Sequence, residues 1–481
     1  MMSTILNENL ISFKELEKKI FAYVCELARE ITQIMLESYD KELAEGRDKK
    51  AYRDKGTRGT SIKTVYGEVS YSRRVYRTEN VEGQVEYIYL LDQAMQMDKI
   101  GLISTNLAEK IALTITESPY RVTSDIINET CGQSISAQGV WNLVQRLGER
   151  IDEEEMHAVH QMNADQAKGS KTIPVLFEEM DGVWLHMQDE HHKRMKKQEM
   201  KVFTMYEGWD AEKEKENRST LVGKIMLAGM EDSNTFHEKR EACIRQKYDV
   251  DEIGQRILNG DGGSWIKEPY DSDAIFQLDR YHIYQEILRK IKNKKAQKEI
   301  RSLLEEEKIE EMLEYIQTYA TSVESPDEEN KESKYARELL KYLENNKDGL
   351  LPYDKQGVKI PEPSEGLIYK HMGVQESQNC TVITMRMKHR RMRWSKAGAN
   401  NLAKVLYRKE NKELVNTIER YTDGLIFTLQ MREVIEILSA AKAPKKDGKG
   451  NPYADRIRMH MPLLDAMQSA STKAFMRAFN S

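Results

Sequence analysis

The 481-residue chain has few cysteines and no long apolar run, and each absence excludes a class of protein. The four cysteines show no CxxC pair and no Cys/His ligand spacing, so the sequence predicts neither a zinc module nor a disulfide framework. No apolar run is long enough to cross a bilayer, the N-terminus lacks a signal-peptide pattern, and no internal repeat is evident. We therefore expect a cytoplasmic protein with no membrane partner.

The charged residues are unevenly distributed along the chain. Hydrophobic residues make up 39% and charged residues 32%, which favours a helix-rich soluble protein of two to four domains. The net charge of −5 argues mildly against a nucleic-acid partner. However, residues 47–77 contain ten Lys/Arg against three acids, and residues 377–409 contain nine Lys/Arg and no acid. These two basic stretches are suited to phosphate binding.

The N-terminal region predicts a long helix followed by a β-hairpin. Apolar residues recur at helical spacing over residues 13–45, and a basic loop follows at 47–59. Residues 61–77 alternate β-branched or aromatic residues with polar ones and predict a hairpin turning near Gly67. Arg73 and Arg74 are candidates to follow a phosphate backbone. A small solvated β-subdomain explains the same pattern equally well.

Residues 104–151 predict three helices, of which the last two have helix-turn-helix spacing. One helix ends near Gly132, and Ser136 caps the next, whose apolar residues face inward. Gln138, Asn142, Gln145 and Arg146 would then lie outside, where a recognition helix places its base- and phosphate-facing residues. An ordinary helical hairpin is the alternative.

From residue 172 onward the sequence predicts an α/β domain. Strands are expected at 173–188, 202–209, 221–229, up to Asp261, and at 274–279, with helices at 235–248 and from Arg280. This order is that of a ribonuclease-H-like domain, in which one acid lies on the first strand and another ends the fourth. Residues 283–348 predict an α-helical insertion, and basic helical segments follow at 376–410 and 412–441.

Three acids on separate elements are candidates for a metal site. Asp181 lies in the first strand, Asp261 ends a later strand, and Glu376 precedes the acid-free basic segment. Phosphodiester chemistry with two Mg²⁺ ions about 4 Å apart requires such hard oxygen ligands. Asp181 and Asp261, each followed by glycine, are alternatively turn residues, although the strand pattern continues past Asp181. Glu376 is alternatively an ordinary surface residue.

Two further features accompany these acids. Asp279 also ends an apolar strand, so it competes for a metal position, but it is equally placed to cap the helix that starts at Arg280. The basic segment is a candidate DNA path, in which arginines bind phosphates and a tryptophan stacks on a base. Its residues are Arg386, Lys388, Arg390, Arg391, Arg393 and Trp394. A basic helix that only solvates the surface is the alternative.

A set of motifs resembles the ISLre-type insertion-sequence transposases, bacterial relatives of the Mutator-type DDE transposases. The motifs are EMDGVW at 179–184, NGDGGSWIK at 259–267, QLDRYH at 277–282, ESQN at 376–379 and the basic segment at 386–399. The resemblance covers nearly the whole chain, including the hairpin (TVYGEV at 64–69) and the helix-turn-helix region.

The resemblance implies a DDE transposase that cleaves transposon ends and transfers the 3′-hydroxyl to target DNA. It implies that Asp181, Asp261 and Glu376 bind two Mg²⁺ ions (or Mn²⁺ in vitro), with Asp279 and His282 as a supporting pair. Its partners would be terminal inverted repeats and target DNA, bound by a homodimer or higher oligomer. The protein would be bacterial and would act at the nucleoid. The alternatives are a non-catalytic helix-turn-helix regulator and a metal-dependent nuclease without strand transfer.

The expected fold is therefore α+β and multidomain, with a ribonuclease-H-like core that carries an α-helical insertion and follows helical and β-hairpin DNA-binding regions. The expected domains are residues 1–100 (long helix and basic hairpin), 101–165 (helix-turn-helix), 166–283 with 368–410 (catalytic core), 284–367 (helical insertion) and 411–481 (C-terminal helices and basic tail).

Overall fold

The computed structural model of the chain is α+β and divides into two compact units. The first unit comprises the described residues up to Leu91 together with Cys131–Gln133, and the second comprises Asp92–Thr130 and the described residues from Ser134 onward. The structure describes residues 12–80, 83–95, 102–166, 168–267, 274–324, 331–389 and 392–422. Most of the C-terminal region expected at 411–481 therefore lies outside the described residues.

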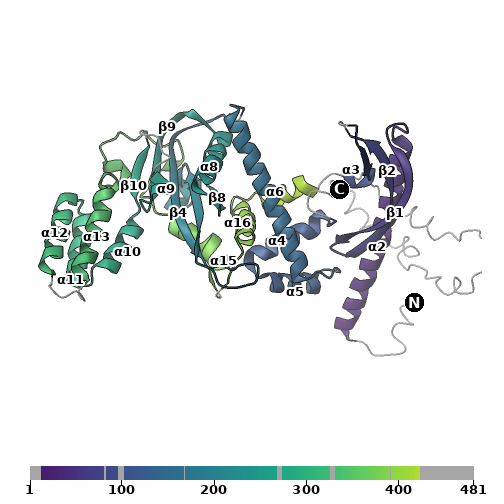
Figure 1. Ribbon diagram of the computed structural model, residues 1–481, viewed down its shortest axis with the longest axis horizontal. Helices are drawn as coiled ribbons and strands as arrows, with labels where there is room; N and C mark the ends of the chain where they lie inside the picture. Colours follow the sequence, from purple (N-terminus) through teal and green to yellow (C-terminus); the bar gives the residue numbers. More distant parts are fainter. Residues whose placement is uncertain are drawn as a thin grey trace, which may run out of the picture. The chain divides into compact units, whose positions relative to one another are not determined.

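The first unit is a long helix with a three-stranded antiparallel sheet (Figure 1). Helix α2 (Phe13–Gly46) begins at a capping box formed by Ser12 and Glu15. The strands, in the order β1-β2-β3, are β1 (Arg53–Thr64), β2 (Gly67–Glu79) and β3 (Val85–Ile88). The expected helix and the hairpin turn at Gly67, whose φ is +128°, are both confirmed.

The basic loop expected at residues 47–59 is partly wrong, because β1 already begins at Arg53. Local composition there is polar and rich in glycine, which favours a loop. Pairing along β2, from Arg53 opposite Arg77 to Thr64 opposite Gly67, holds this polar segment extended. The tertiary pairing therefore overrides the local preference.

The second unit begins with a helical region that matches the expectation. Helices α4 (Thr105–Glu117), α5 (Tyr120–Thr130) and α6 (Ala137–Asn163) are present, and the Ser136 side chain caps α6 by accepting from the Gly139 amide. Apolar residues of α6 such as Val140 and Leu147 are buried, as is Ile135 in the turn before it. Helix α6 is longer than expected and continues beyond the turn pair into the second unit's main body.

The main body is built on a five-stranded mixed sheet with strand order β10-β9-β4-β5-β8. Strands β4, β5 and β8 are antiparallel neighbours, whereas β9 and β10 run parallel to β4. The strands are β4 (Lys171–Leu185), β5 (Gln198–Tyr206), β8 (Ile225–Gly229), β9 (Tyr248–Gly260) and β10 (Ile275–Leu278). Helix α8 (Ser233–Lys247) connects β8 to β9. The central strand β4 is buried on both faces over most of its length, and its buried residues include Glu178, Glu179 and Asp181 among the apolar ones.

Two expected strands are each divided by a glycine. The strand expected at 202–209 ends as β5 at Tyr206, and β6 (Gly208–Asp210) follows in a separate small sheet with β7 (Leu221–Val222) and β11 (Leu367–Ile368). The strand expected at 221–229 is likewise divided into β7 and β8. Gly208 has a φ of +140° and Gly223 a φ of +68°, so the chain changes direction at both positions.

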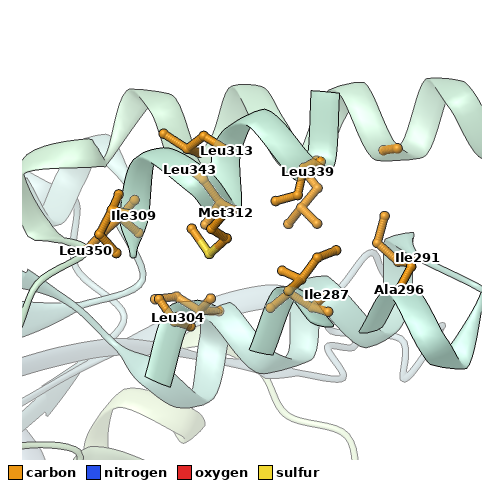
Figure 2. Close-up of a cluster of buried hydrophobic side chains, with 14 of the residues drawn as sticks. Ile287, Ile291, Ala296, Leu304, Ile309, Met312, Leu313, Leu339, Leu343 and Leu350 are labelled. Carbon is orange, nitrogen blue, oxygen red and sulfur yellow. The ribbon is translucent and has the colours of Figure 1, made fainter. Parts of the chain in front are cut away.

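The expected helical insertion forms a bundle with its own core (Figure 2). Its helices are α10 (Arg280–Lys290), α11 (Lys294–Glu305), α12 (Ile309–Ser322) and α13 (Glu332–Asn345). Ile287, Met312 and Leu339 meet in this core, which continues to Leu278 of β10. The insertion is therefore anchored on the β10 edge of the sheet, as Figure 1 shows.

After the insertion the chain returns to the sheet through short helices. These are α14 (Gln375–Gln378), a π-helical segment η3 (Asn379–Thr384), α15 (Met385–Met387), α16 (Lys396–Glu410) and α17 (Leu414–Thr422). Throughout the described parts of the chain, every helix is too short or too polar to span a membrane.

Candidate functional site

Two carboxylates come from neighbouring parallel strands at the centre of the five-stranded sheet. Asp181 lies inside β4, where it pairs with Val202 of β5, so the expectation of an acid within a strand is confirmed and a turn at this position is excluded. Strand β9 ends at Gly260, opposite Met180 of β4, so that Asp261 leaves β9 next to Asp181. The side chain of Asp181 is buried and that of Asp261 is half-buried.

Asp261 follows the last residue of β9 and also forms part of a turn. The two interpretations of this residue, an acid at a strand end and a turn residue, are therefore compatible. The Gly263 amide donates to Asp261 Oδ1 at 2.8 Å, and Gly262 has a φ of +82°. The glycines therefore allow the sharp exit from β9 while leaving Asp261 Oδ2 available to a ligand.

Asp279 caps helix α10, as one of its two expected roles requires. Its Oδ1 accepts from the amides of Tyr281 and His282 at 2.8 and 3.3 Å, and its Oδ2 accepts from the Asn259 side chain at 2.7 Å. Because both oxygens are used and the residue is only 5% exposed, Asp279 is poorly placed to compete for a metal position. The cap instead orients His282, whose Nε2 lies 3.5 Å from Asp181 Oδ1.

A buried residue of β4 fixes the segment that carries Glu376. Glu179, two residues before Asp181 on the same face of β4, is fully buried. Its carboxylate accepts from the amides of Gly373, Val374 and Gln375 at 3.0, 3.2 and 3.0 Å, and from the Tyr206 hydroxyl at 2.7 Å. The loop that starts α14, and with it Glu376, is thus fixed to the strand that carries Asp181.

A second contact links α14 and η3 to the first acid. The Asn379 side-chain amide donates to Asp181 Oδ2 at 2.6 Å, and Gln375 donates in turn to Asn379. Gln375 and Asn379, four residues apart, form the buried face of this segment that meets β4, whereas the neighbouring Glu376 is exposed. These contacts hold the segment that carries Glu376 beside Asp181, and the meeting of Asp181, Asp261 and Glu376 in one metal site stays a prediction.

The acids at this site raise one another's pKa values. Burial raises the pKa of Asp261, and the negative charge of Asp181 adds to this effect. Burial and then the charge of Asp181 likewise raise the pKa of Glu376. Burial alone would lower the pKa of His282, but its contact with Asp181 and the other nearby carboxylates raise this pKa to about 9. The region thus holds more negative charge than its own residues neutralise.

Asp181, Asp261 and Glu376 are chemically suited to hard divalent cations such as Mg²⁺, which prefer carboxylate oxygens. Their oxygens are not all within 4.8 Å of one another, the spacing that a single ion among three acids would need. The two ions expected at this region stay a prediction.

A second acidic cluster has the tighter spacing but is already neutralised. Asp152, Glu155 and Glu231 offer oxygens that lie within 4.8 Å of one another. The ammonium group of Lys239 lies 2.5, 3.0 and 2.7 Å from these three acids, and Lys404 pairs with the same three. The two lysines occupy the positions that a metal ion would take, so this cluster is a buried ion-pair network.

The residues expected to contact DNA in the N-terminal regions are only partly at the surface. Gln138, Asn142 and Arg146 of α6 are exposed, whereas the neighbouring Gln145, expected outside, is buried and accepts from Asn401. Arg73 is 9% exposed and lies over the Tyr89 ring, so its expected phosphate contact is wrong. An alternating strand puts every second side chain inward, and Arg73 occupies an inward position.

Arg74 is partly exposed but paired. Its Nη1 lies 2.7 Å from Asp40 of α2, and its Nε lies 3.7 Å from Asp54. Arg74 therefore connects the hairpin to the helix within the first unit, and its availability to a phosphate is reduced.

The basic segment at residues 386–394 is divided between interior and surface. Arg386 is 6% exposed, and its Nε donates to the Ile115 carbonyl at 2.7 Å. Trp394 is 7% exposed, and its Nε1 donates to the Met387 carbonyl at 2.8 Å. The expectation that these two line a DNA path is wrong, because their large side chains fill the interior while their polar groups find backbone partners.

The other members of this segment have different outcomes. Lys388 and Arg393 are exposed, as the DNA-path interpretation requires. Arg390 and Arg391, which are also part of that interpretation, lie outside the described residues.

Residues 6–420 match the model of a family described as "Uncharacterised protein family (UPF0236)". The chain belongs to this family. A UPF0236 protein of Caldanaerobacter subterraneus subsp. tengcongensis is 25% identical over 410 residues, which cover 83% of this chain and 78% of the relative. A UPF0236 protein from the vanSb 3′ region of Streptococcus gallolyticus is 23% identical over 407 residues, covering 82% and 83% of the two chains. The match to the UPF0236 family includes every acid of the site.

Two residues of the site do not stand out in the sequence of this UPF0236 member. Glu179 shares a strand face with Asp181 through the i, i+2 spacing, which was its only local signal. Glu199 of β5 is the other: burial raises its pKa, and the charges of Asp261 and Asp181 add to this. Its proximity to the acids depends on the pairing of β5 with β4, which no local pattern reveals.

Proposed function

We propose that the chain is a DNA transposase of the DDE type, which cleaves transposon ends and joins the 3′-hydroxyl to target DNA. The observation that carries this proposal is that Asp181 and Asp261 lie on neighbouring strands, while the segment that carries Glu376 is bound to Glu179 and Asp181 of the same strand. Such a set of hard oxygen ligands without a compensating lysine is what metal-dependent phosphodiester chemistry needs.

The sheet supports a ribonuclease-H-like core as part of this proposal. Three antiparallel strands (β8, β5, β4) are followed by two strands parallel to β4 (β9, β10), and α8 connects the two sets. In the ribonuclease-H-like arrangement the first acid lies on the first strand and the second acid ends the fourth. Asp181 on β4 and Asp261 after β9 correspond to those positions, and the helical insertion precedes Glu376.

In this proposal each residue of the site has a distinct task. Asp181, Asp261 and Glu376 hold two Mg²⁺ or Mn²⁺ ions, which when bound activate the attacking oxygen and stabilise charge on the leaving oxygen. His282, whose Nε2 lies 3.5 Å from Asp181 Oδ1, would hold Asp181 in position. Glu179 fixes the loop that carries Glu376. Water is the nucleophile in end cleavage, and the terminal 3′-hydroxyl is the nucleophile in strand transfer.

The relatives add an independent line of support. The name of one Caldanaerobacter relative joins eleven locus designations of a single strain, and the name of another joins four. A gene that copies or moves itself produces related sequences at many loci. The motif resemblance to ISLre-type transposases points in the same direction, and so do the exposed Gln138, Asn142 and Arg146 as candidates to read terminal repeats.

The deciding experiment uses the full-length chain and a plasmid that carries the DNA flanking its gene. With Mg²⁺ or Mn²⁺ we expect cleavage at the element's ends, and with EDTA none. Asp261→Ala should abolish cleavage but retain binding to the ends, whereas Asp251→Ala, at an exposed position earlier on the same strand, should behave as the wild type.

The same assay separates the two rival functions. End binding without any metal-dependent cleavage would identify a regulator that uses its helix-turn-helix alone. Cleavage without joined product, when pre-cut ends are mixed with a target plasmid, would identify a nuclease.

A further inference from the structure

The segment between β4 and β5 presents a group of cations on an ordered turn. Residues 186–197 read HMQDEHHKRMKK, and their four Lys/Arg residues are all exposed. The Asp189 carboxylate accepts from the amides of His191 and Lys193 at 3.0 and 2.8 Å, and Gln188 bridges to Arg194. These bonds hold the turn in a defined conformation, so its cations project from a built surface.

Backbone hydrogen bonds join this segment to the chain that follows Glu376. The Trp394 amide donates to the His186 carbonyl at 3.0 Å, and the Gln188 amide donates to the Trp394 carbonyl at 2.9 Å. The buried Trp394 therefore anchors the turn and brings the adjacent Arg393 beside it. The surface formed by Lys193, Arg194, Lys196, Lys197, Lys388 and Arg393 is called the cationic ridge below.

Four of the six cations of the ridge act on His186. Burial lowers the pKa of His186, and the charges of Lys197, Arg194, Arg393 and Lys388 lower it further. Lys388 is joined to the turn through Trp394, whose Nε1 donates to the carbonyl of the preceding Met387 at 2.8 Å. The ridge thus extends from the β4–β5 turn to the end of α15, and η3 and α15 directly follow α14 with its Glu376.

The cations of the ridge lack the partners that similar residues have elsewhere. Within the described residues, no carboxylate lies within 4.0 Å of any of the six, whereas Lys213, Lys215 and Arg218 near α7 (Ala211–Lys215) each pair with a glutamate. Unpaired like charges repel one another, and an extended polyanion relieves that repulsion along its whole length. A DNA backbone, with its regularly spaced phosphates, matches an elongated cationic surface better than a compact anion does.

We propose that the cationic ridge binds the phosphates of the DNA duplex that enters the acid site, so that the β4–β5 turn positions the strand to be cut. This inference rests on the proposed function for its direction toward Glu376, but the binding itself does not require catalysis. The bond type is the charge-assisted contact between Lys or Arg and a phosphate oxygen, which is independent of sequence.

The test measures binding of the full chain to a fluorescent 30-base-pair duplex of arbitrary sequence, in EDTA, over a series of KCl concentrations. Arg194→Ala/Lys196→Ala/Lys197→Ala should reduce the slope of log K against log salt by roughly 2 to 3 and weaken binding about tenfold or more near 0.1 M salt. Lys213→Ala/Lys215→Ala/Arg218→Ala is the matched control, because both triple variants change the net charge from −5 by three units to −8. The control should retain the wild-type slope.

The conservative variant Arg194→Lys/Lys196→Arg/Lys197→Arg should also retain the slope. This result would show that the loss of charge, rather than a change in local folding, weakens duplex binding in the alanine variant. An unchanged slope in the alanine variant, an equal loss in the control, or no duplex binding by the wild type would overturn the proposal. Loss of binding in the alanine variant together with an inactive wild type would leave the ridge established and reject the transposase instead. Intact cleavage by the wild type, together with an unchanged slope in the alanine variant, would support the transposase and reject the ridge.

Discussion

The two acidic clusters of the second unit contain similar residues but differ in what neutralises them. Around Asp152, Glu155 and Glu231, two buried lysines lie within ion-pair distance of all three acids. Around Asp181, Asp261 and Glu376, the only described cation in ion-pair contact is His282. A buried cluster that supplies its own counter-ions is part of the architecture. A cluster that does not supply them can take a ligand from solution, and this difference is the reason why we propose the second cluster as the functional one.

The largest expected effect comes from removing one charge of the unneutralised cluster. Asp181→Asn should lower metal-dependent cleavage by roughly 10³-fold, because a bound ion provides several kcal/mol of transition-state stabilisation and each 1.36 kcal/mol is a factor of ten. Cleavage of labelled element ends at saturating DNA measures this. The melting temperature should not fall. A variant that is both inactive and unfolded would contradict the proposal that this cluster serves function whereas the other stabilises the fold.

Removing a lysine from the neutralised cluster should lower stability and leave activity unchanged. Lys404→Met leaves three buried acids with one lysine and should reduce the free energy of unfolding by about 3–5 kcal/mol. Urea unfolding measures this loss, and activity per folded molecule should stay unchanged. Lys409→Met is the control in the same helix, because Lys409 pairs with Glu117 at the surface and its loss should cost less than about 1 kcal/mol.

The neutralised cluster should also make stability depend on pH. Burial would raise the pKa of Glu231, but Lys404 and Lys239 lower it to about 2 from the ordinary value of 4.5. A lowered folded-state pKa means that the stabilisation is fully present above pH 4.5 and is lost as the pH falls toward 2. Glu231→Gln should remove about 3 kcal/mol of this dependence, as urea unfolding midpoints between pH 6 and pH 2.5 would show. An unchanged pH profile in the variant would contradict the assignment.

A smaller effect is expected from the anchor of the third acid. Glu179→Gln places an amide where the carboxylate accepts three backbone N–H groups, so α14 should shift and Glu376 should lose its position. Cleavage should slow roughly 10- to 100-fold, and the Mg²⁺ concentration for half-maximal rate should rise, with DNA affinity unchanged. Glu178→Gln, one residue earlier on the opposite face and paired with Arg256, should change stability but not the Mg²⁺ dependence. A normal Mg²⁺ dependence in Glu179→Gln would show that Glu179 contributes to packing and does not position Glu376.

The smallest effect concerns the stability of the unneutralised cluster itself. Since burial and Asp181 raise the pKa of Asp261, the charged form of Asp261 is disfavoured in the folded chain at neutral pH. Asp261→Asn should therefore raise the free energy of unfolding by about 0.5–1 kcal/mol while it abolishes activity, a trade-off common at functional sites. A decrease in stability would indicate that Asp261 is part of the architecture, like Glu155.

Local patterns predict those features that depend on neighbouring residues. The helical periodicity of α2, the Ser136 cap and the Asp279 cap are all confirmed, because each depends on contacts a few residues apart. The in-strand position of Asp181 also follows from the continuing apolar pattern of β4. By contrast, the surface role expected for Arg386 and Trp394 is wrong. Their charge and aromaticity do not determine which residues from distant parts of the chain pack over them.

The sequence by itself determined the order of helices and strands, the residues available as metal ligands and the two basic stretches. Only the tertiary structure decided which acids meet Lys239 and Lys404, how Glu179 fixes the loop before Glu376, and which cations stay unpaired beside the β4–β5 turn. The reason is physical: periodicity and capping are energies between neighbours in the chain, whereas charge balance depends on groups that approach one another only when the sheet has formed.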